Sequence, residues 1–107
     1  MARLAVLGAG SWGTAFAQLA ADAGNDVVIW GRDEFIVESI TNEHVNPAFH
    51  PGLTLPSSVW ASTNVATVLR GADIVVLAIP AQVLRSRVIE WREHIPPTAI
   101  IISFIKG

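Results

Sequence analysis

A glycine-rich segment near the start of the chain limits the possible folds more than any other feature. Gly8, Gly10 and Gly13 follow the spacing G-x-G-x-x-G, between an apolar run at residues 4–7 and a stretch with helical periodicity. A strand, a tight glycine turn and a helix in this order are typical of a dinucleotide-binding unit. The segment therefore predicts a site for the phosphates of a dinucleotide, against the alternative of a merely structural tight turn.

Each residue of this segment has an expected role. Gly8 lets the chain turn sharply off the strand, Gly10 leaves room for a pyrophosphate, and Gly13 lets the helix pack close to the strand. The amino end of the helix offers N–H groups and a partial positive charge to phosphates. We expect Ser11 to bind phosphate, to cap the helix, or both. Trp12 is expected either to cover the pyrophosphate or to be an interface aromatic.

Apolar runs alternate with helix-periodic stretches along the whole chain, which is typical of βαβ units on a parallel sheet. Strands are expected at residues 3–7, 26–30, 59–61, 73–79 and 98–104. Helices are expected at residues 11–23, 33–41, 64–69 and 82–94, with a proline-rich irregular stretch at residues 42–58. The elements predict an α/β fold, a Rossmann-type doubly wound parallel sheet in three αβα layers with strand order 3-2-1-4-5. The ligand crevice is then expected at the carboxyl ends of the first and fourth strands.

Apolar stripes predict the buried faces of two helices, and Asp33 is the expected N-cap of the helix at residues 33–41. In the first helix, which Gly24 ends, the stripe consists of Phe16, Leu19, Ala20 and Ala23. In the last helix, the residues expected to face inward are Val83, Leu84, Val88 and Trp91.

The composition narrows the class of protein. A chain of 107 residues forms one domain. Half of its residues are apolar and 15% are charged, which fits a sheet covered on both faces or a surface meant for a further domain. Because the chain stops directly after an apolar strand, we expect it to be an N-terminal fragment.

Charge and residue usage argue against several partners. A net charge of −2 without a basic run argues against nucleic acid. The longest apolar run, residues 74–79, is far shorter than the ~20 residues of a membrane span, which argues against membrane insertion. The lack of cysteine excludes disulfides and fits a cytoplasmic protein. His44, His50 and His94 lack a spacing that suggests a metal site.

The residues after the second expected strand bear on which nicotinamide cofactor fits. A cofactor with a free ribose 2′-OH usually meets an acidic residue at this place. Here the place falls on Gly31, followed by Arg32. A small residue followed by arginine leaves room for a 2′-phosphate and supplies a bidentate cation. The pair predicts a preference for NADP over NAD, against the alternative that Arg32 is an ordinary solvated arginine.

Several segments together resemble bacterial NAD(P)-dependent glycerol-3-phosphate dehydrogenase. The similar segments are GAGSWGTA at residues 8–15, VIWGR at 28–32, the stretch from Asn46-Pro47 to Pro51, residues 72–82 with Arg85, and SFIKG at 103–107. The resemblance covers the whole chain in order. Ile79, where the family usually has valine, and Phe104-Ile105, where it usually has leucine or threonine nearby, are mild departures.

The resemblance implies a function and a set of contacts. Residues 1–107 would be the NAD(P)-binding Rossmann domain of an enzyme that reduces dihydroxyacetone phosphate to sn-glycerol 3-phosphate for phospholipid synthesis. Ser11, Trp12, Arg32 and Lys106 would contact NADP or NAD, with Phe49 as a weaker candidate. Lys106 would also contact the phosphorylated substrate. The helical substrate domain, with its general-acid lysine, is absent, so the fragment is not expected to turn over alone.

Two other interpretations stay open at this point. The first is a different two-domain reductase, of the ketopantoate or 6-phosphogluconate type. Such enzymes share the glycines but are not expected to show both the Ser11-Trp12 pair and the Ser-x-x-Lys-Gly ending. The second is a regulatory module that senses a nucleotide without chemistry. A homodimer is also left open.

Overall fold

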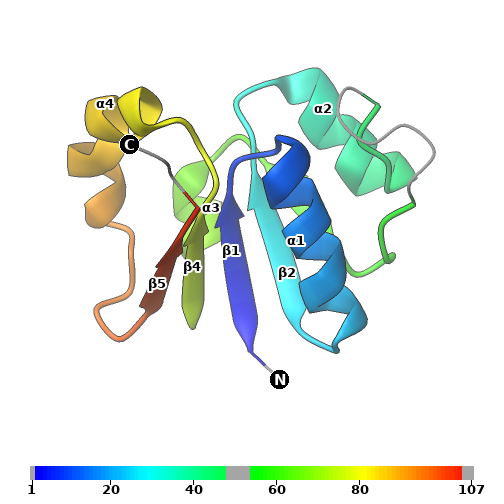
Figure 1. Ribbon diagram of the computed structural model, residues 1–107, viewed down its shortest axis with the longest axis horizontal. Helices are drawn as coiled ribbons and strands as arrows, with labels where there is room; N and C mark the ends of the chain where they lie inside the picture. The colour runs from blue at the N-terminus through cyan, green and yellow to red at the C-terminus, as the bar shows by residue number, and fades with distance from the viewer. Residues whose placement is uncertain (1, 48–53, 105–107) are drawn as a thin grey trace.

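The chain folds around a parallel sheet of five strands with helices on both sides (Figure 1). The computed structural model describes residues 2–47 and 54–104. In chain order, its elements are β1 (Arg3–Leu7), α1 (Ser11–Asp22), β2 (Asp26–Trp30), α2 (Glu34–Glu38), the π-helical turn η1 (Ser39–Glu43), β3 (Trp60–Ser62), α3 (Val65–Leu69), β4 (Ile74–Leu77), α4 (Ala81–Arg92) and β5 (Ile100–Ser103).

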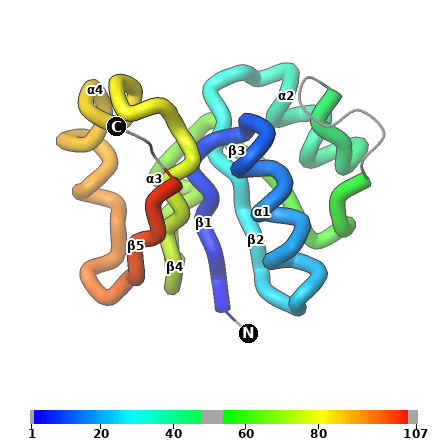
Figure 2. The backbone as a smooth tube through the Cα atoms, viewed as in Figure 1, coloured from blue at the N-terminus to red at the C-terminus, as the bar shows by residue number. Residues whose placement is uncertain are grey.

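The strands lie in the order β3-β2-β1-β4-β5 and every neighbouring pair is parallel, which confirms the predicted fold class and strand order. In the central strand, Ala5 lies beside Val28 of β2 on one side and Val75 of β4 on the other. All three side chains are fully buried, as expected for inner strands of a sheet covered on both faces. Parallel strands place all their carboxyl ends at one edge, the upper edge in Figures 1 and 2.

Two separate apolar cores lie on the two faces of the sheet, which confirms the three layers. On one face, Val6 and Ile29 pack with residues of α1, α2 and η1, among them Ala17, Ile36 and Ile40. On the other face, residues of β1, β2 and β4 pack with α3 and α4; the members of this cluster include Leu7, Val28, Trp30, Val68, Leu69 and Trp91.

Several element boundaries differ from the predicted ones. The expected helix at residues 33–41 is a short α-helix that continues as a π-helical turn to Glu43, and β3 lies one residue later than expected. The expected strand at residues 73–79 ends at Leu77. It ends there because its two neighbours end with it: Leu77 lies beside Leu7, the last residue of β1, and Ser103, the last of β5. Asp33 is the N-cap of α2 as predicted, and its carboxylate accepts from the N–H of Phe35 at 2.9 Å.

The predicted apolar stripes are partly wrong. In α1, Leu19 is 70% exposed and Ala23 is exposed, whereas the buried residues are Gly13, Thr14, Ala17 and Ala20. The helix lies so close to the sheet that only small side chains fit between them. In α4, Trp91 is buried and Val83 and Leu84 pack half-buried against the same core, but Val88 is exposed. No helix in the described part of the chain is long and apolar enough to cross a membrane.

Candidate functional site

A hollow of about 480 Å³ opens at the carboxyl edge of the sheet, where the chain leaves β1, β2 and β4. Three segments line it: the turn after β1, the turn after β2 with the start of α2, and the turn after β4 with the start of α4. The lining residues are Gly8, Ala9, Gly10, Trp30, Gly31, Arg32, Asp33, Ile36, Ala78, Ile79, Pro80 and Val83. The hollow therefore lies where the strand order predicts the ligand crevice.

The fold itself requires Gly8 and Gly13. Gly8 has φ +132°, a conformation that residues with a side chain rarely adopt, and its N–H donates to the carbonyl of Trp30 at 2.9 Å. A Cβ at Gly8 would collide with the carbonyl group of Ala78 in the turn after β4. A Cβ at Gly13 would collide with the carbonyl oxygen of Gly8. These two glycines therefore bring β1, β4 and the start of α1 together.

Gly10 differs from the other two glycines of the motif. Its φ is −78°, and a Cβ there would meet no atom of the described chain within 4 Å. Neither backbone conformation nor internal packing explains a glycine at this position. A bare backbone here leaves room for a molecule that approaches the loop from outside, such as a bound phosphate group.

Ser11 and Trp12 lie beside the hollow but do not line it. Gly10 is the N-cap of α1, because its carbonyl accepts the first helical bond from the N–H of Thr14 at 2.9 Å. The prediction that Ser11 caps this helix is therefore wrong, and Ser11 is the first helical residue. Trp12 follows it and is 78% exposed in the first turn of α1. Both side chains flank the glycine turn at the amino end of the helix.

The turn after β2 packs against the glycine turn. Gly31 is buried, and a Cβ there would lie 3.1 Å from Cβ of Ala9 and 3.3 Å from a methyl group of Val37. Arg32 is exposed and lines the hollow. The nearest carboxylate in the sequence, that of Asp33, caps α2 through the N–H groups of Phe35 and Ile36. Within the described residues, no ion pair engages the Arg32 guanidinium at this end of the hollow.

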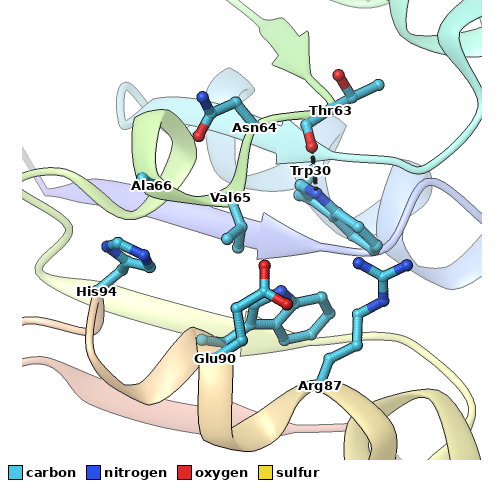
Figure 3. A pocket seen from close by; sticks show the side chains of 9 residues that line it. Trp30, Thr63, Asn64, Val65, Ala66, Arg87, Glu90 and His94 are labelled. Carbon is cyan, nitrogen blue, oxygen red and sulfur yellow. Dashed lines mark hydrogen bonds between the residues drawn. The ribbon is translucent and has the colours of Figure 1, made fainter.

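Trp30, which the sequence interpretation did not single out, fixes the end of β2 (Figure 3). Its Nε1–H donates to the carbonyl of Thr63 at 3.0 Å, and its ring meets that of Trp91 at a centroid distance of 4.8 Å. The Arg87 guanidinium carbon lies 5.7 Å from the centroid of the Trp30 ring. Trp30 thus forms a wall between the hollow at the sheet edge and a second hollow of about 400 Å³ between α3 and α4. The only sequence signal for it is a large aromatic at the last position of a buried strand.

Asn46 is the second residue that sequence interpretation missed. Its side chain is almost fully buried, and its Nδ2 donates to the carbonyl of Ala9 at 2.8 Å and to Oγ1 of Thr14 at 3.0 Å. Asn46 therefore connects the glycine turn with the segment that follows η1. An asparagine before a proline in an irregular stretch carries no sequence signal of such a distant contact.

Two predicted site residues, Phe49 and Lys106, lie outside the described residues, and their roles remain predictions. Of the other predicted cofactor contacts, the structure brings Gly8, Gly10 and Arg32 together around one hollow. Gly13 packs against the carbonyl oxygen of Gly8 at the start of the turn, and Ser11 and Trp12 flank the turn. Among residues 2–47 and 54–104 no cluster of histidine, cysteine, aspartate or glutamate side chains could hold a metal ion.

Comparison with known proteins identifies one family. The family model of the NAD-dependent glycerol-3-phosphate dehydrogenase N-terminus matches residues 3–107. A glycerol-3-phosphate dehydrogenase [NAD(P)+] of Streptomyces griseus is 47% identical over 105 residues, which are 98% of this chain and 31% of that protein. The enzyme of the same name from Thermobifida fusca is 48% identical over 108 residues, 100% of this chain and 32% of that protein. The chain thus spans about a third of the length of these relatives.

Solved structures give the same result. The glycerol-3-phosphate dehydrogenase of Coxiella burnetii superposes with a TM-score of 0.91 at 27% identity, over 99% of this chain and 33% of that one. The enzyme of Plasmodium falciparum has a TM-score of 0.88 at 32% identity, over 99% of this chain and 32% of that one. A ketopantoate reductase of Ralstonia eutropha, at 21% identity and a TM-score of 0.77, covers 98% of this chain and 34% of that one and shares the fold alone.

Proposed function

This chain belongs to the NAD-dependent glycerol-3-phosphate dehydrogenase N-terminal family, and on that premise we propose that it binds NADP or NAD at the carboxyl edge of its sheet. The observation that carries the proposal is the turn around Gly10. This turn lies at the amino end of α1, opens into the hollow, and has a glycine that neither backbone conformation nor packing requires. When bound, the nicotinamide of the cofactor would supply or accept a hydride.

The hollow suggests how the cofactor lies. The pyrophosphate would lie over the glycine turn, where the first N–H groups of α1 and the helix dipole favour a negative charge. The adenosine ribose would reach the turn after β2, where Gly31 leaves space and Arg32 supplies a cation for a 2′-phosphate. Ser11 and Trp12 would contact the cofactor from the side of the helix. Lys106, and more weakly Phe49, are proposed contacts on the strength of the resemblance.

We propose that the domain serves an enzyme that reduces dihydroxyacetone phosphate to sn-glycerol 3-phosphate. Both curated relatives described above carry the name of that enzyme, and the chain spans about a third of their length. In this proposal, residues 1–107 bind the cofactor, and Lys106 contacts the phosphorylated substrate. The group that donates a proton to the substrate would belong to the other two thirds of the enzyme.

The same two thirds would cover an apolar surface beside α1. On the α1 side of the sheet, no helix of the described chain covers β4 and β5 (Figures 1 and 2). Leu19 is 70% and Ile100 63% exposed there, and Phe16 packs on the half-exposed Phe104 with ring centroids 5.5 Å apart. An exposed apolar surface of this kind favours a partner domain. We propose that the C-terminal helical domain of the longer enzyme is that partner.

Calorimetric titration of the chain with NADPH and with NADH tests the cofactor proposal. The wild type should bind both, NADPH more tightly, and Arg32→Ala should weaken NADPH by about 1.5–3 kcal/mol and NADH much less. Arg70→Ala is the matched control, because Arg70 is an exposed arginine at the opposite edge of the sheet, just before β4. Equal losses for both cofactors in Arg32→Ala would contradict the role of Arg32. No binding of either cofactor to the wild type would contradict the function.

A further inference from the structure

We infer that Asn46 is a positioning residue for the cofactor phosphates, which it serves by fixing the orientation of the peptide between Ala9 and Gly10. The inference rests on the cofactor site proposed above and adds a residue that does not itself line the hollow but contacts Ala9, which does. Its basis is a set of three hydrogen bonds among Asn46, Thr14 and the carbonyl of Ala9 in the glycine turn.

The three groups of this set are mutually bonded. Asn46 Nδ2 donates to the Ala9 carbonyl at 2.8 Å and to Thr14 Oγ1 at 3.0 Å, and Thr14 Oγ1 donates to the same carbonyl at 3.4 Å. Asn46 is 1% exposed and Thr14 is 0% exposed. Both donors are therefore shielded from solvent, and they are the side chains that bond the Ala9 carbonyl within the described residues. Thr14 alone, at 3.4 Å, would hold it weakly.

The orientation of the Asn46 amide is fixed by chemistry. A carbonyl oxygen accepts hydrogen bonds and cannot donate one, so the group that faces Ala9 must be the NH₂ of Asn46. The Oδ1 atom is buried and has no partner within the described residues. Burial of an unpaired acceptor costs free energy. The protein tolerates this cost at a side chain that donates to the Ala9 carbonyl from a distant segment.

The consequence for a ligand follows from the planarity of the peptide. No peptide bond in the described chain is cis, so the Ala9 carbonyl and the Gly10 N–H point in opposite directions. The carbonyl is held inward by Asn46 and Thr14. The Gly10 N–H therefore points away from Asn46 and Thr14, and a Cβ of Gly10 would meet no atom of the described chain within 4 Å. This N–H is the first donor that a phosphate over the turn would meet.

The residues just before Asn46 are themselves anchored to another part of the chain. His44, in the left-handed conformation with φ 58°, turns the chain after η1. Its backbone carbonyl accepts from the N–H of Leu55 at 2.7 Å. Leu55 is buried in the same apolar core as Ile40. Asn46 thus extends to the glycine turn from an anchored segment and holds the Ala9–Gly10 peptide in one orientation.

Asn46→Ala tests the inference, with Asn25→Ala as the matched control. Asn25, beyond the far end of α1, also makes two side-chain hydrogen bonds. Its Nδ2 donates to the carbonyl of Ala20 at 3.0 Å, and its Oδ1 accepts from the N–H of Ala2 at 3.1 Å. With both variants folded by circular dichroism, Asn46→Ala should raise the Kd for NADPH about tenfold or more. Asn25→Ala should leave this Kd unchanged.

A second probe separates positioning from general damage to the site. Adenosine 2′-monophosphate has the 2′-phosphate but no pyrophosphate, so its binding should be unaffected by Asn46→Ala while Arg32→Ala weakens it. An equal loss for both ligands in Asn46→Ala, or no loss for NADPH, would overturn the inference. Wild-type protein that binds no NADPH would instead overturn the proposed function.

A measurement on the wild type keeps the inference testable even if Asn46→Ala does not fold. In ¹H–¹⁵N spectra, the Gly10 amide proton should show a downfield shift on saturation with NADPH. The amides of Gly24 and Gly71, at other turns, should not move. An unchanged Gly10 signal in NADPH-saturated protein would overturn the inference.

Discussion

The backbone of Gly13, in the first turn of α1, packs directly against the carbonyl oxygen of Gly8 at the end of β1. A Cβ at Gly13 would overlap that oxygen and would also lie 3.4 Å from the Cβ of Ala78 in the turn after β4. The obstacle is backbone, which cannot rotate away as a flexible side chain can. The amino end of α1 faces the hollow. This helix can lie so close to the sheet because Gly13 has no side chain.

Gly13→Ala should accordingly destabilise the fold. The new methyl group must push α1 away from β1, and overpacking of this kind costs about 1–3 kcal/mol. Urea unfolding followed by circular dichroism measures the loss. Gly24→Ala is a poor control because Gly24 has φ +94°, so Gly10→Ala, at an ordinary φ, serves instead. A Gly13→Ala variant as stable as the wild type would contradict the packing described here.

Gly10→Ala should separate binding from stability. The N-cap preference for glycine over alanine and the lower entropy of the unfolded alanine chain have opposite signs, so stability should change by less than about 1 kcal/mol. The methyl group would, however, stand where we propose the pyrophosphate. Affinity for NADPH should fall about tenfold or more, as measured by calorimetric titration. If the folded variant binds NADPH as tightly as the wild type does, the proposal that the pyrophosphate lies over this turn is wrong.

Trp30→Phe should destabilise the end of β2. The substitution removes the bond from Nε1 to the Thr63 carbonyl and part of the contact with Trp91, at a cost of about 1–3 kcal/mol. Trp60→Phe is the matched control, because Trp60 is only partly buried and its ring N–H donates no hydrogen bond within the described residues. Thermal unfolding compares the two. Equal losses in the two variants would mean that the hydrogen bond from Trp30 Nε1 to the Thr63 carbonyl does not contribute to stability.

Asp33→Ala should cost about 1 kcal/mol of stability through loss of the N-cap of α2, because its carboxylate accepts from two N–H groups, those of Phe35 and Ile36. Asp33→Asn keeps a side-chain acceptor and should lose less. Glu38→Ala, an exposed acidic residue at the other end of α2, should change stability by less than about 0.5 kcal/mol. Chemical denaturation measures the free energy of unfolding of the three variants. The reverse order of losses would contradict the role of Asp33 as the N-cap.

The chain of 107 residues should bind NADPH without oxidising it when dihydroxyacetone phosphate is added. Catalysis needs the cofactor, the substrate and a proton donor held together, and in our proposal the donor belongs to the remaining length of the enzyme. Absorbance at the wavelength of reduced nicotinamide follows the reaction, with buffer and cofactor alone as the blank. Oxidation that depends on dihydroxyacetone phosphate would place a complete active site within these residues.

Much of the fold could be predicted from local patterns. The glycine spacing at residues 8–13 and the apolar runs of β1, β2 and β4 identify parallel strands and their turns, because backbone sterics and burial act on each segment by itself. The strand order follows from the rule that a doubly wound sheet changes direction beside its first strand. The same rule placed Gly8, Gly10 and Arg32 at one edge, and the hollow there confirms that edge.

Other features were decided only when distant segments met. A hydrophobic period shows that α1 has an apolar side but not how closely it approaches the sheet, so Leu19 was expected inside and is exposed. Gly10 rather than Ser11 caps the helix, because the position of the first helical bond depends on the path of the turn. The bond from Asn46 to Ala9 joins residues 37 positions apart. Side chains this far apart in the sequence meet only through the packing of the elements between them. The sequence by itself therefore determined the sheet and its glycine turn, and only the tertiary structure decided which side chains support that turn.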